Sequence, residues 1–143
     1  MKIKIKRTEQ DIPLLEYKTQ GAAAFDFYTR ETKTILPGEI GYIPLNVAIE
    51  VPEGYFLLMA ARSGLHKRGL MLANGIAVFD PDFSGDEDEY IAVCFNFSKS
   101  PVIVERGERI TQGLLIKSDR ITWEEVQQMK NMSRGGLGST GHK

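Results

Sequence analysis

Residues 40–59 read IGYIPLNVAIEVPEGYFLLM, and this stretch decides the fold class. It contains three short apolar or alternating runs, at 40–43, 45–51 and 56–59, and Pro52-Glu53-Gly54 separates the last two. Alternation with a period of two is typical of half-buried strands, and proline and glycine between such runs favour reversals of the chain. The stretch therefore predicts consecutive strands rather than a helix.

The same pattern extends over most of the chain. Further short apolar or alternating runs occupy 2–6, 76–79, 90–97 and 102–104. The turn signals between the runs include Pro37-Gly38, Asn74-Gly75, Ser84-Gly85 and Arg106-Gly107. Many short strands spaced by turns indicate an all-β sandwich or barrel.

The C-terminal part of the chain has two interpretations. Thr122 and Glu125 match a capping box ahead of a helix, whereas the apolar residues around Trp123 suit an extended arm equally well. Beyond them, residues 133–143 are rich in glycine, which loses the most backbone entropy on ordering. We expect a single domain over 1–143 that ends in this flexible tail.

Composition excludes several classes of protein. A chain of 143 residues is about one domain and buries a core without a metal or disulfide. Its net charge of −1, without a sustained basic stripe, favours neither nucleic acid nor membrane as a partner. The single Cys94 lies in an apolar run and is predicted to be a buried hydrophobe. Together with the lack of an export signal, this predicts a cytoplasmic protein.

The densest chemistry lies at residues 80–89, DPDFSGDEDE, with six carboxylates in ten positions. The segment does not match a calcium-binding loop, because Ile91 stands where a bidentate glutamate is needed. Asp80 alone, at the end of the apolar run 76–79, is a candidate general base, and Phe83 is a candidate aromatic wall for a ring. Residues 86–89 are interpreted as a solvated hairpin tip.

Three segments suit anions. Arg62-Ser63-Gly64 combines a guanidinium, a hydroxyl and an unhindered backbone N–H, which together favour phosphate oxygens. The tail Arg134 to Gly141 supplies another guanidinium and two hydroxyls beside glycine N–H groups, and its alternative is a frayed terminus. Arg109, in the segment 107–113, suits a structural ion pair or a ligand equally well.

In order along the chain, five segments resemble the five motifs of the trimeric dUTPase family, whose members cleave dUTP to dUMP and pyrophosphate. These segments are residues 23–28, 61–65, 74–85, 107–112 and 134–141. The short fifth motif resembles a phage and Gram-positive bacterial subgroup. The resemblance implies a dUTPase-like β-barrel or jelly-roll domain with an extended C-terminal arm, assembled as a homotrimer with shared active sites. It also implies the cellular role of limiting uracil incorporation into DNA and supplying dUMP for dTMP synthesis.

The resemblance also implies residue roles. Asp80 would contact the sugar 3′-hydroxyl and orient or deprotonate the water that attacks the α-phosphorus. The segment 74–79 would read uracil largely through backbone groups. Mg²⁺ would bridge the triphosphate oxygens, with Asp26 as its outer-shell partner through water. The substrate-binding residues implied are Arg62, Ser63, Gly64, Asn74, Phe83, Gln112, Arg134, Leu137, Gly138, Ser139 and Thr140.

The sequence departs from the family pattern at several positions. Phe83 stands where the family usually has tyrosine, and Ala77 replaces a usual glycine. Leu137 stands where a uracil-stacking phenylalanine is common, so the tail is predicted to clamp the triphosphate rather than to cover the base. Tyr90 is a candidate to cover the base instead. Residues 86–89 lengthen the segment after the third motif.

Two alternatives stay open at this point. A dCTP deaminase of the same fold needs a glutamate in the strand after the hairpin, where this chain has Val93, and only Glu89 lies near. A dUTPase-like regulatory protein would bind nucleotide without turnover. The presence of Asp80, Gln112 and both motif arginines argues against such an inactive site.

Overall fold

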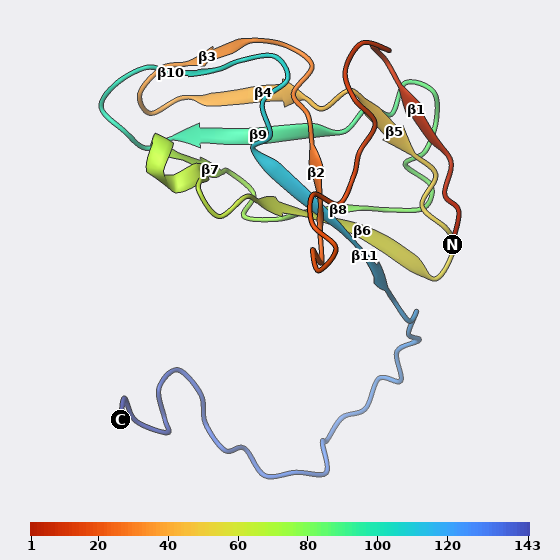
Figure 1. Cartoon of the computed structure of the whole chain (residues 1–143). Helices are drawn as coiled ribbons and strands as arrows, with labels where there is room; N and C mark the ends of the chain where they lie inside the picture. The colour runs from red at the N-terminus through yellow and green to blue at the C-terminus, as the bar shows by residue number, and fades with distance from the viewer.

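The computed structural model describes all 143 residues, and its regular secondary structure consists of β-strands and one short 3₁₀ turn (Figure 1). The strands are β1 (Ile5–Arg7), β2 (Phe25–Phe27), β3 (Lys33–Ile35), β4 (Ile40–Pro44), β5 (Val47–Ile49), β6 (Tyr55–Ala61), β7 (Leu70–Leu72), β8 (Ala77–Phe79), β9 (Ile91–Asn96), β10 (Val102–Val104) and β11 (Thr111–Lys117). A single 3₁₀ turn, η1 (Leu65–Arg68), follows β6. No helix here is long and apolar enough to cross a membrane.

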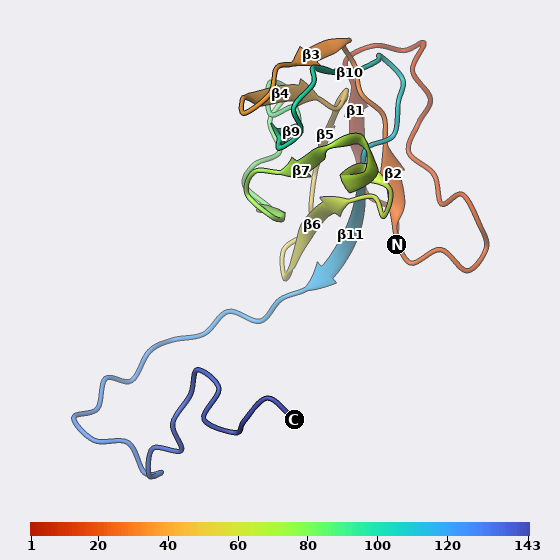
Figure 2. The ribbon, with the colours of Figure 1, turned by 90° about the vertical axis from the view of Figure 1, so that its left-hand side faces the viewer.

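The strands form four small sheets, and every strand pair is antiparallel. The orders are β1-β5, β10-β3, β2-β11-β6-β8 and β4-β9-β7. In Figures 1 and 2 these sheets curve around a common interior, with β3, β4 and β10 on one side and β6 and β11 on the other. The predicted all-β sandwich or barrel is confirmed.

Alternating side chains build the core between the sheets. Along β9, Ala92, Cys94 and Asn96 are buried, whereas the residues between them face outward. Seventeen buried apolar residues form one cluster, to which β2, β6 and β9 all contribute. A period of two places every second residue on the same face of a strand, so the alternation read from the sequence is also the pattern of burial.

Gly113 allows β11 to lie against β2. A Cβ atom at this position would stand 2.7 Å from the ring of Phe27 and 2.8 Å from the ring of Phe25, closer than real contacts allow. With glycine there, Gln112 lies opposite Asp26 on one side and Ala60 on the other. The glycine therefore permits the strand pairing in which Gln112 and Asp26 lie opposite each other.

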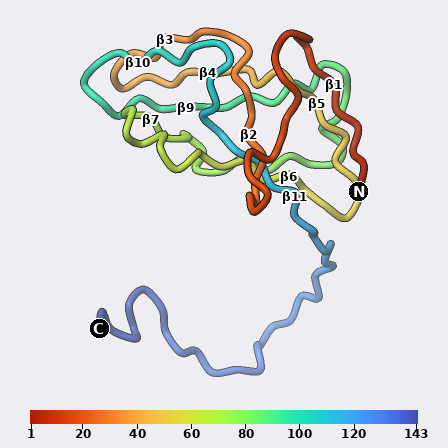
Figure 3. Tube along the Cα trace, in the orientation of Figure 1, coloured from red at the N-terminus to blue at the C-terminus, as the bar shows by residue number.

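After β11 the chain leaves the sheets as an extended, exposed arm (Figures 2 and 3). No helix follows Thr122, so that interpretation is wrong and the extended arm is confirmed. Trp123 is 88% exposed and Met132 is 93% exposed. A short amphipathic helix is marginal in water without a surface to pack on, and residues 117–143 are exposed throughout. The flexibility expected for residues 133–143 stays a prediction.

Cys94 is buried, as predicted. Burial raises the pKa of its thiol to about 11 from an ordinary 9.0, because the apolar interior disfavours the thiolate. The unfolded chain therefore releases this proton at lower pH than the folded chain does. The stabilising contribution of the group is fully present below the unfolded pKa and is lost as pH rises toward the folded pKa.

We therefore expect the free energy of unfolding to fall between about pH 9 and 10, and to fall less steeply in Cys94→Ala. Urea unfolding at a series of pH values measures both slopes. The pH window ends at about 10 because burial also raises the pKa of Tyr90, whose ordinary value is 10.0. Above that pH, Tyr90 would add to the loss of stability and hide the contribution of Cys94. Equal slopes in the two proteins would contradict the assignment to Cys94.

Candidate active site

Asp26 lies at the centre of a polar cluster on β2. Its side chain is only 11% exposed, and its Oδ1 lies 3.2 Å from Nε of Arg62. Its Oδ2 accepts a hydrogen bond of 2.8 Å from Arg109. Arg62 also donates to the backbone carbonyl of Arg109 at 3.1 Å. One carboxylate thus holds two guanidinium groups side by side, and the three residues together carry a net positive charge.

A cavity of about 560 Å³ opens beside this cluster. Its lining consists of Arg62, Ser63, Gly64, Leu65, Arg68, Gly107, Glu108, Arg109 and Ile110. Three arginines against one glutamate make the cavity electropositive, and the forked guanidinium is the side chain best suited to phosphate oxygens. The cavity can therefore receive a phosphate chain.

Arg68 and Glu108 join the two walls of this cavity. Arg68 donates to Oε2 of Glu108 at 3.0 Å and to the carbonyl of Ile103 at 2.6 Å. The same Oε2 accepts the backbone N–H of Glu105 at 2.8 Å. Sequence reasoning did not predict this pair. The available signal was that Arg68 lies four residues after the predicted anion-binding segment Arg62-Ser63-Gly64.

Gln112 reaches the same cluster from β11. Its Nε2 donates to the carbonyl of Ala61 at 3.0 Å, directly before Arg62. Antiparallel pairing of β11 with both β2 and β6 brings these segments together although they are far apart in the sequence. Arg109, whose role the sequence left open, makes a structural ion pair with Asp26. Arg109 also lines the cavity, so the two interpretations are compatible.

Asp80 lies far from the Asp26 cluster within one chain. It follows Phe79, which pairs with Leu57 on β6, whereas Arg62 follows the opposite end of β6. Six residues of strand separate the two positions, which corresponds to about 20 Å. Asp80 is exposed and borders a second cavity of about 570 Å³, together with Asp82 and Arg120. One chain therefore does not bring its candidate base to its own phosphate cavity.

The turn between β7 and β8 presents backbone groups to solvent. Asn74, Gly75 and Ile76 are exposed, and Gly75 has φ 71°, the left-handed region that glycine adopts without strain. Strand β8 stands at the edge of its sheet, with β6 on one side only. An edge strand offers a row of unpaired N–H and C=O groups. A flat heterocycle with alternating donors and acceptors can bind to such an edge.

The tail residues lie away from both cavities. Arg134, Leu137, Gly138, Ser139 and Thr140 are all exposed. Leu137 has φ 48°, an uncommon conformation for a residue with a side chain. Within one chain these residues contact neither the Asp26 cluster nor Asp80.

Tyr90 is fully buried, so the prediction that it covers a base is wrong. Its ring stacks on Phe79 and lies 6.2 Å from the ring of Phe83, centroid to centroid. Phe83 itself is 39% exposed. The apolar interior therefore takes up Tyr90 and leaves Phe83 as the ring that faces outward at this loop.

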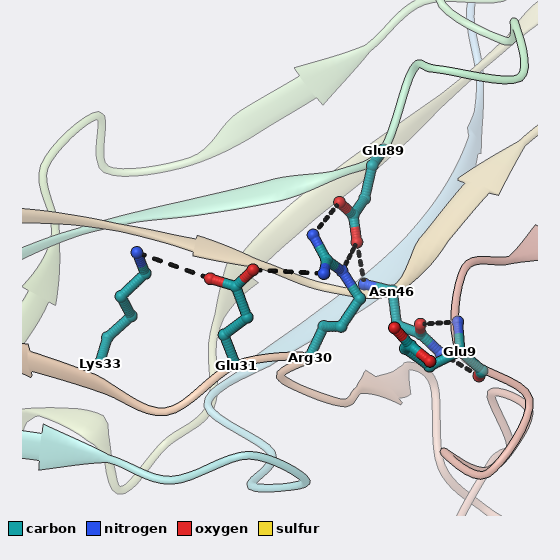
Figure 4. A network of polar contacts seen from close by, with 6 residues as sticks. All are labelled: Glu9, Arg30, Glu31, Lys33, Asn46 and Glu89. Carbon is teal, nitrogen blue, oxygen red and sulfur yellow. Dashed lines mark hydrogen bonds and ion pairs between the residues drawn. The ribbon is translucent and has the colours of Figure 1, made fainter.

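The Glu89 side chain is held by an arginine and a backbone N–H and is not part of a solvated hairpin tip. Its side chain is 19% exposed and pairs with Arg30 through two hydrogen bonds, of 2.6 and 2.9 Å. It also accepts the backbone N–H of Asn46 at 2.9 Å (Figure 4). The interpretation of 86–89 as a solvated tip is therefore wrong for Glu89. Since its carboxylate is fully engaged, Glu89 does not supply the acid that a deaminase needs.

The residues around Asp26 fit a hydrated metal ion better than a directly bound one. No group of three or more histidine, cysteine, aspartate or glutamate side chains is placed to hold a metal. Each Asp26 oxygen faces one guanidinium and keeps a further lone pair. Such an oxygen suits a hydrogen bond from a metal-bound water.

Comparison with known proteins identifies the relatives of this chain. A family model described as dUTPase matches residues 10–141. The deoxyuridine 5′-triphosphate nucleotidohydrolase of Dictyoglomus turgidum is 42% identical over 99% of both chains. The enzyme of the same name from Caldanaerobacter subterraneus subsp. tengcongensis is 37% identical over 97% of both chains.

Solved structures share the fold. The dUTPase from Streptococcus mutans superimposes with a TM-score of 0.76 at 28% identity, over 83% of this chain and 98% of that one. The dUTPase of Staphylococcus bacteriophage 80alpha, solved with dUPNHPP, has a TM-score of 0.85 at 20% identity, over 98% of both chains. At that identity the phage enzyme supports the fold alone.

Proposed function

Because this chain belongs to the dUTPase family and is a deoxyuridine 5′-triphosphate nucleotidohydrolase, we propose that three copies build its active sites between them. Each site takes Asp80 from one copy and the Asp26 cluster from another. The observation that carries this proposal is the separation of about 20 Å along β6 between Asp80 and Arg62. The base and the phosphate cavity serve one substrate only if different chains supply them.

The arm supports assembly into a trimer. It exposes Trp123 and Met129, at 88% and 77%, which is costly for a chain alone in water. A groove of about 530 Å³ on the body is lined by apolar residues only: Met1, Ile3, Ile5, Leu15, Tyr17, Phe25, Ile49, Leu57 and Leu115. The arm of a neighbouring copy covers this groove and carries Arg134 toward a neighbouring site.

Asp80 is the general base of the reaction. It accepts a proton from the water that attacks the α-phosphorus of dUTP, and the bond to the β-phosphate oxygen breaks. The products are dUMP and pyrophosphate. A positioned general base contributes about 10²–10⁴-fold to such a step. Phe83 packs against the deoxyribose and crowds out a 2′-hydroxyl, and its missing hydroxyl removes one hydrogen bond of the family pattern.

The triphosphate is held by two sets of residues. Arg62, Ser63 and Gly64 bind from the electropositive cavity, and Gln112 lies on the α-phosphate side. Arg134, Ser139 and Thr140 close over the far end from the tail, accompanied by Leu137 and Gly138. The dUTPase family generally uses Mg²⁺, which when bound neutralises charge that develops on the leaving pyrophosphate. Asp26 would hold the ion through one of its bound waters, because its carboxylate oxygens can accept a hydrogen bond.

Uracil is read by the backbone of residues 74–79, beginning at Asn74. The exposed turn and the unpaired edge of β8 support this assignment. A fixed pattern of backbone donors and acceptors pairs with uracil and leaves cytosine with unpaired buried groups. Such a mismatch costs a large factor in specificity. The cytoplasmic location and the role in limiting uracil in DNA stay predictions.

A panel of nucleotides tests reaction, base, sugar and metal together. We expect rapid pyrophosphate release from dUTP with Mg²⁺, a strong loss when EDTA removes the metal, and little release from dCTP, dTTP or UTP. Pyrophosphate and ammonia are measured in parallel. Ammonia from dCTP would identify a deaminase, and binding of dUTP without any product would identify a regulatory protein.

A further inference from the structure

Three aromatic rings lie together at the loop that carries Asp80. The rings of Phe79 and Tyr90 are parallel to within 5°, with their centroids 3.6 Å apart. Phe83 lies 6.1 Å from Phe79 and 6.2 Å from Tyr90, with its ring inclined to theirs by less than 30°. Tyr90 is fully buried, so it is the part of the stack that belongs to the core.

This stack surrounds Asp80 in the sequence. Phe79 directly precedes Asp80, and the N–H of Phe83 donates to the carbonyl of Asp80 at 3.1 Å, closing a turn. A second hydrogen bond stabilises this turn one residue further along: the Ser84 hydroxyl donates to the carbonyl of Pro81 at 2.9 Å. Phe79, directly before Asp80, therefore stacks on the buried Tyr90 ring, and Phe83 lies beside both rings. A displaced Tyr90 ring would shift both ends of the turn.

Two backbone hydrogen bonds fix the position of Tyr90. Its N–H donates to the carbonyl of Val47 at 2.8 Å, and its carbonyl accepts from Leu45 at 2.9 Å. The preceding Glu89 is fixed by Arg30 and by the N–H of Asn46 (Figure 4). The acidic residues 86–88 before it are tied to the body only through the exposed Lys6. The contacts of Glu89 thus fix the chain between the exposed acidic residues 86–88 and the aromatic stack.

We propose that Tyr90 is a positioning residue for catalysis. Its backbone is fixed next to Glu89, and its ring holds the turn that carries Asp80 and Phe83 in the geometry that catalysis requires. This inference rests on the proposed role of Asp80. The contacts that join Tyr90 to Phe79 and Phe83 are made by its ring, so we assign the task to the ring. The residue touches neither substrate nor reacting atoms, and it acts through its neighbours.

The test compares Tyr90→Leu with Tyr90→Phe in the full-length trimeric enzyme, well below the unfolding temperature. We expect Tyr90→Leu to lower kcat for dUTP about tenfold or more, since misplacing a catalytic group by about 1 Å can cost 10²-fold. KM should change less than kcat, because the triphosphate is bound at the Arg62 cavity, away from this stack. Tyr90→Phe keeps the ring and should retain the kcat of the original protein.

Two further variants make the result decisive. Ile35→Ala removes a buried side chain on β3, away from the loop, and should lower stability without lowering kcat. Glu89→Gln keeps an acceptor for Asn46 but removes the charge facing Arg30, and should lower kcat more mildly with KM unchanged. If Tyr90→Leu does not fold, Glu89→Gln decides.

An unchanged kcat in Tyr90→Leu, or in Glu89→Gln where that variant decides, overturns the inference. So does a kcat loss in Tyr90→Phe equal to that in Tyr90→Leu, or a loss in Ile35→Ala as large. These outcomes leave the proposed function intact as long as turnover of dUTP still depends on Asp80. If turnover does not depend on Asp80, the proposed function fails first.

Discussion

Asp80→Asn should lower kcat for dUTP by about 10²–10⁴-fold while the nucleotide still binds. Asparagine has nearly the shape of aspartate but does not accept a proton at neutral pH. Asp80 is exposed directly after β8, so the substitution disturbs no core packing and no ion pair. The loss therefore belongs to the chemical step rather than to folding.

Pyrophosphate release under single-turnover conditions, together with equilibrium binding of a non-hydrolysable dUTP analogue, measures the two effects separately. Asp86→Asn is the matched control. It removes a carboxylate from the same loop, 82% exposed and paired only with Lys6 at the surface, and should keep full turnover. Turnover that survives in Asp80→Asn would show that another group takes the proton.

Mixed trimers should regain activity that neither parent has. Arg62→Ala removes a charged donor to phosphate and should cost about 10²–10³-fold on its own. If each site takes Asp80 from one chain and Arg62 from the next, every trimer containing both Arg62→Ala and Asp80→Asn chains keeps one intact site. We therefore expect about one third of the original activity in such trimers.

Co-expression with two different affinity tags isolates these trimers from the parents. The matched control combines Arg62→Ala with Gln112→Ala, because both residues belong to the cluster of a single chain. Every chain then carries a defect in its own cluster, and no site is restored. No recovery in the first mixture would place the whole site within one chain, and recovery in the control would divide the cluster between chains.

Long alternating runs made several strands predictable. The runs 40–43, 90–97 and 102–104 correspond closely to β4, β9 and β10. Strands β2, β3 and β7 were not predicted; β10 is equally short and was, so three residues give a weaker signal than the longer runs of β4 and β9. Strand β11 contains Gly113 and a continuous apolar run, and its place between β2 and β6 depends on the rings that pack against that glycine.

The candidate site was predicted in its residue types and only partly in its contacts. Gln112 donates to the carbonyl of Ala61, the residue directly before Arg62, so two of the motif segments lie side by side. The pairing of Arg109 with Asp26 was one of two open roles, and sequence spacing alone does not choose between them. The burial of Tyr90 was missed, since a tyrosine after an acidic turn is compatible with either surface or core.

By itself, the sequence determined the all-β class, the buried thiol and the residues capable of binding phosphate and moving a proton, because these depend on local alternation and side-chain chemistry. Only the tertiary structure decided which of these residues meet. Strand register places Arg62 beside Asp26 and sends Asp80 to the far end of β6. A contact between distant segments depends on how strands align and pack across the sheet, and no local pattern encodes that alignment.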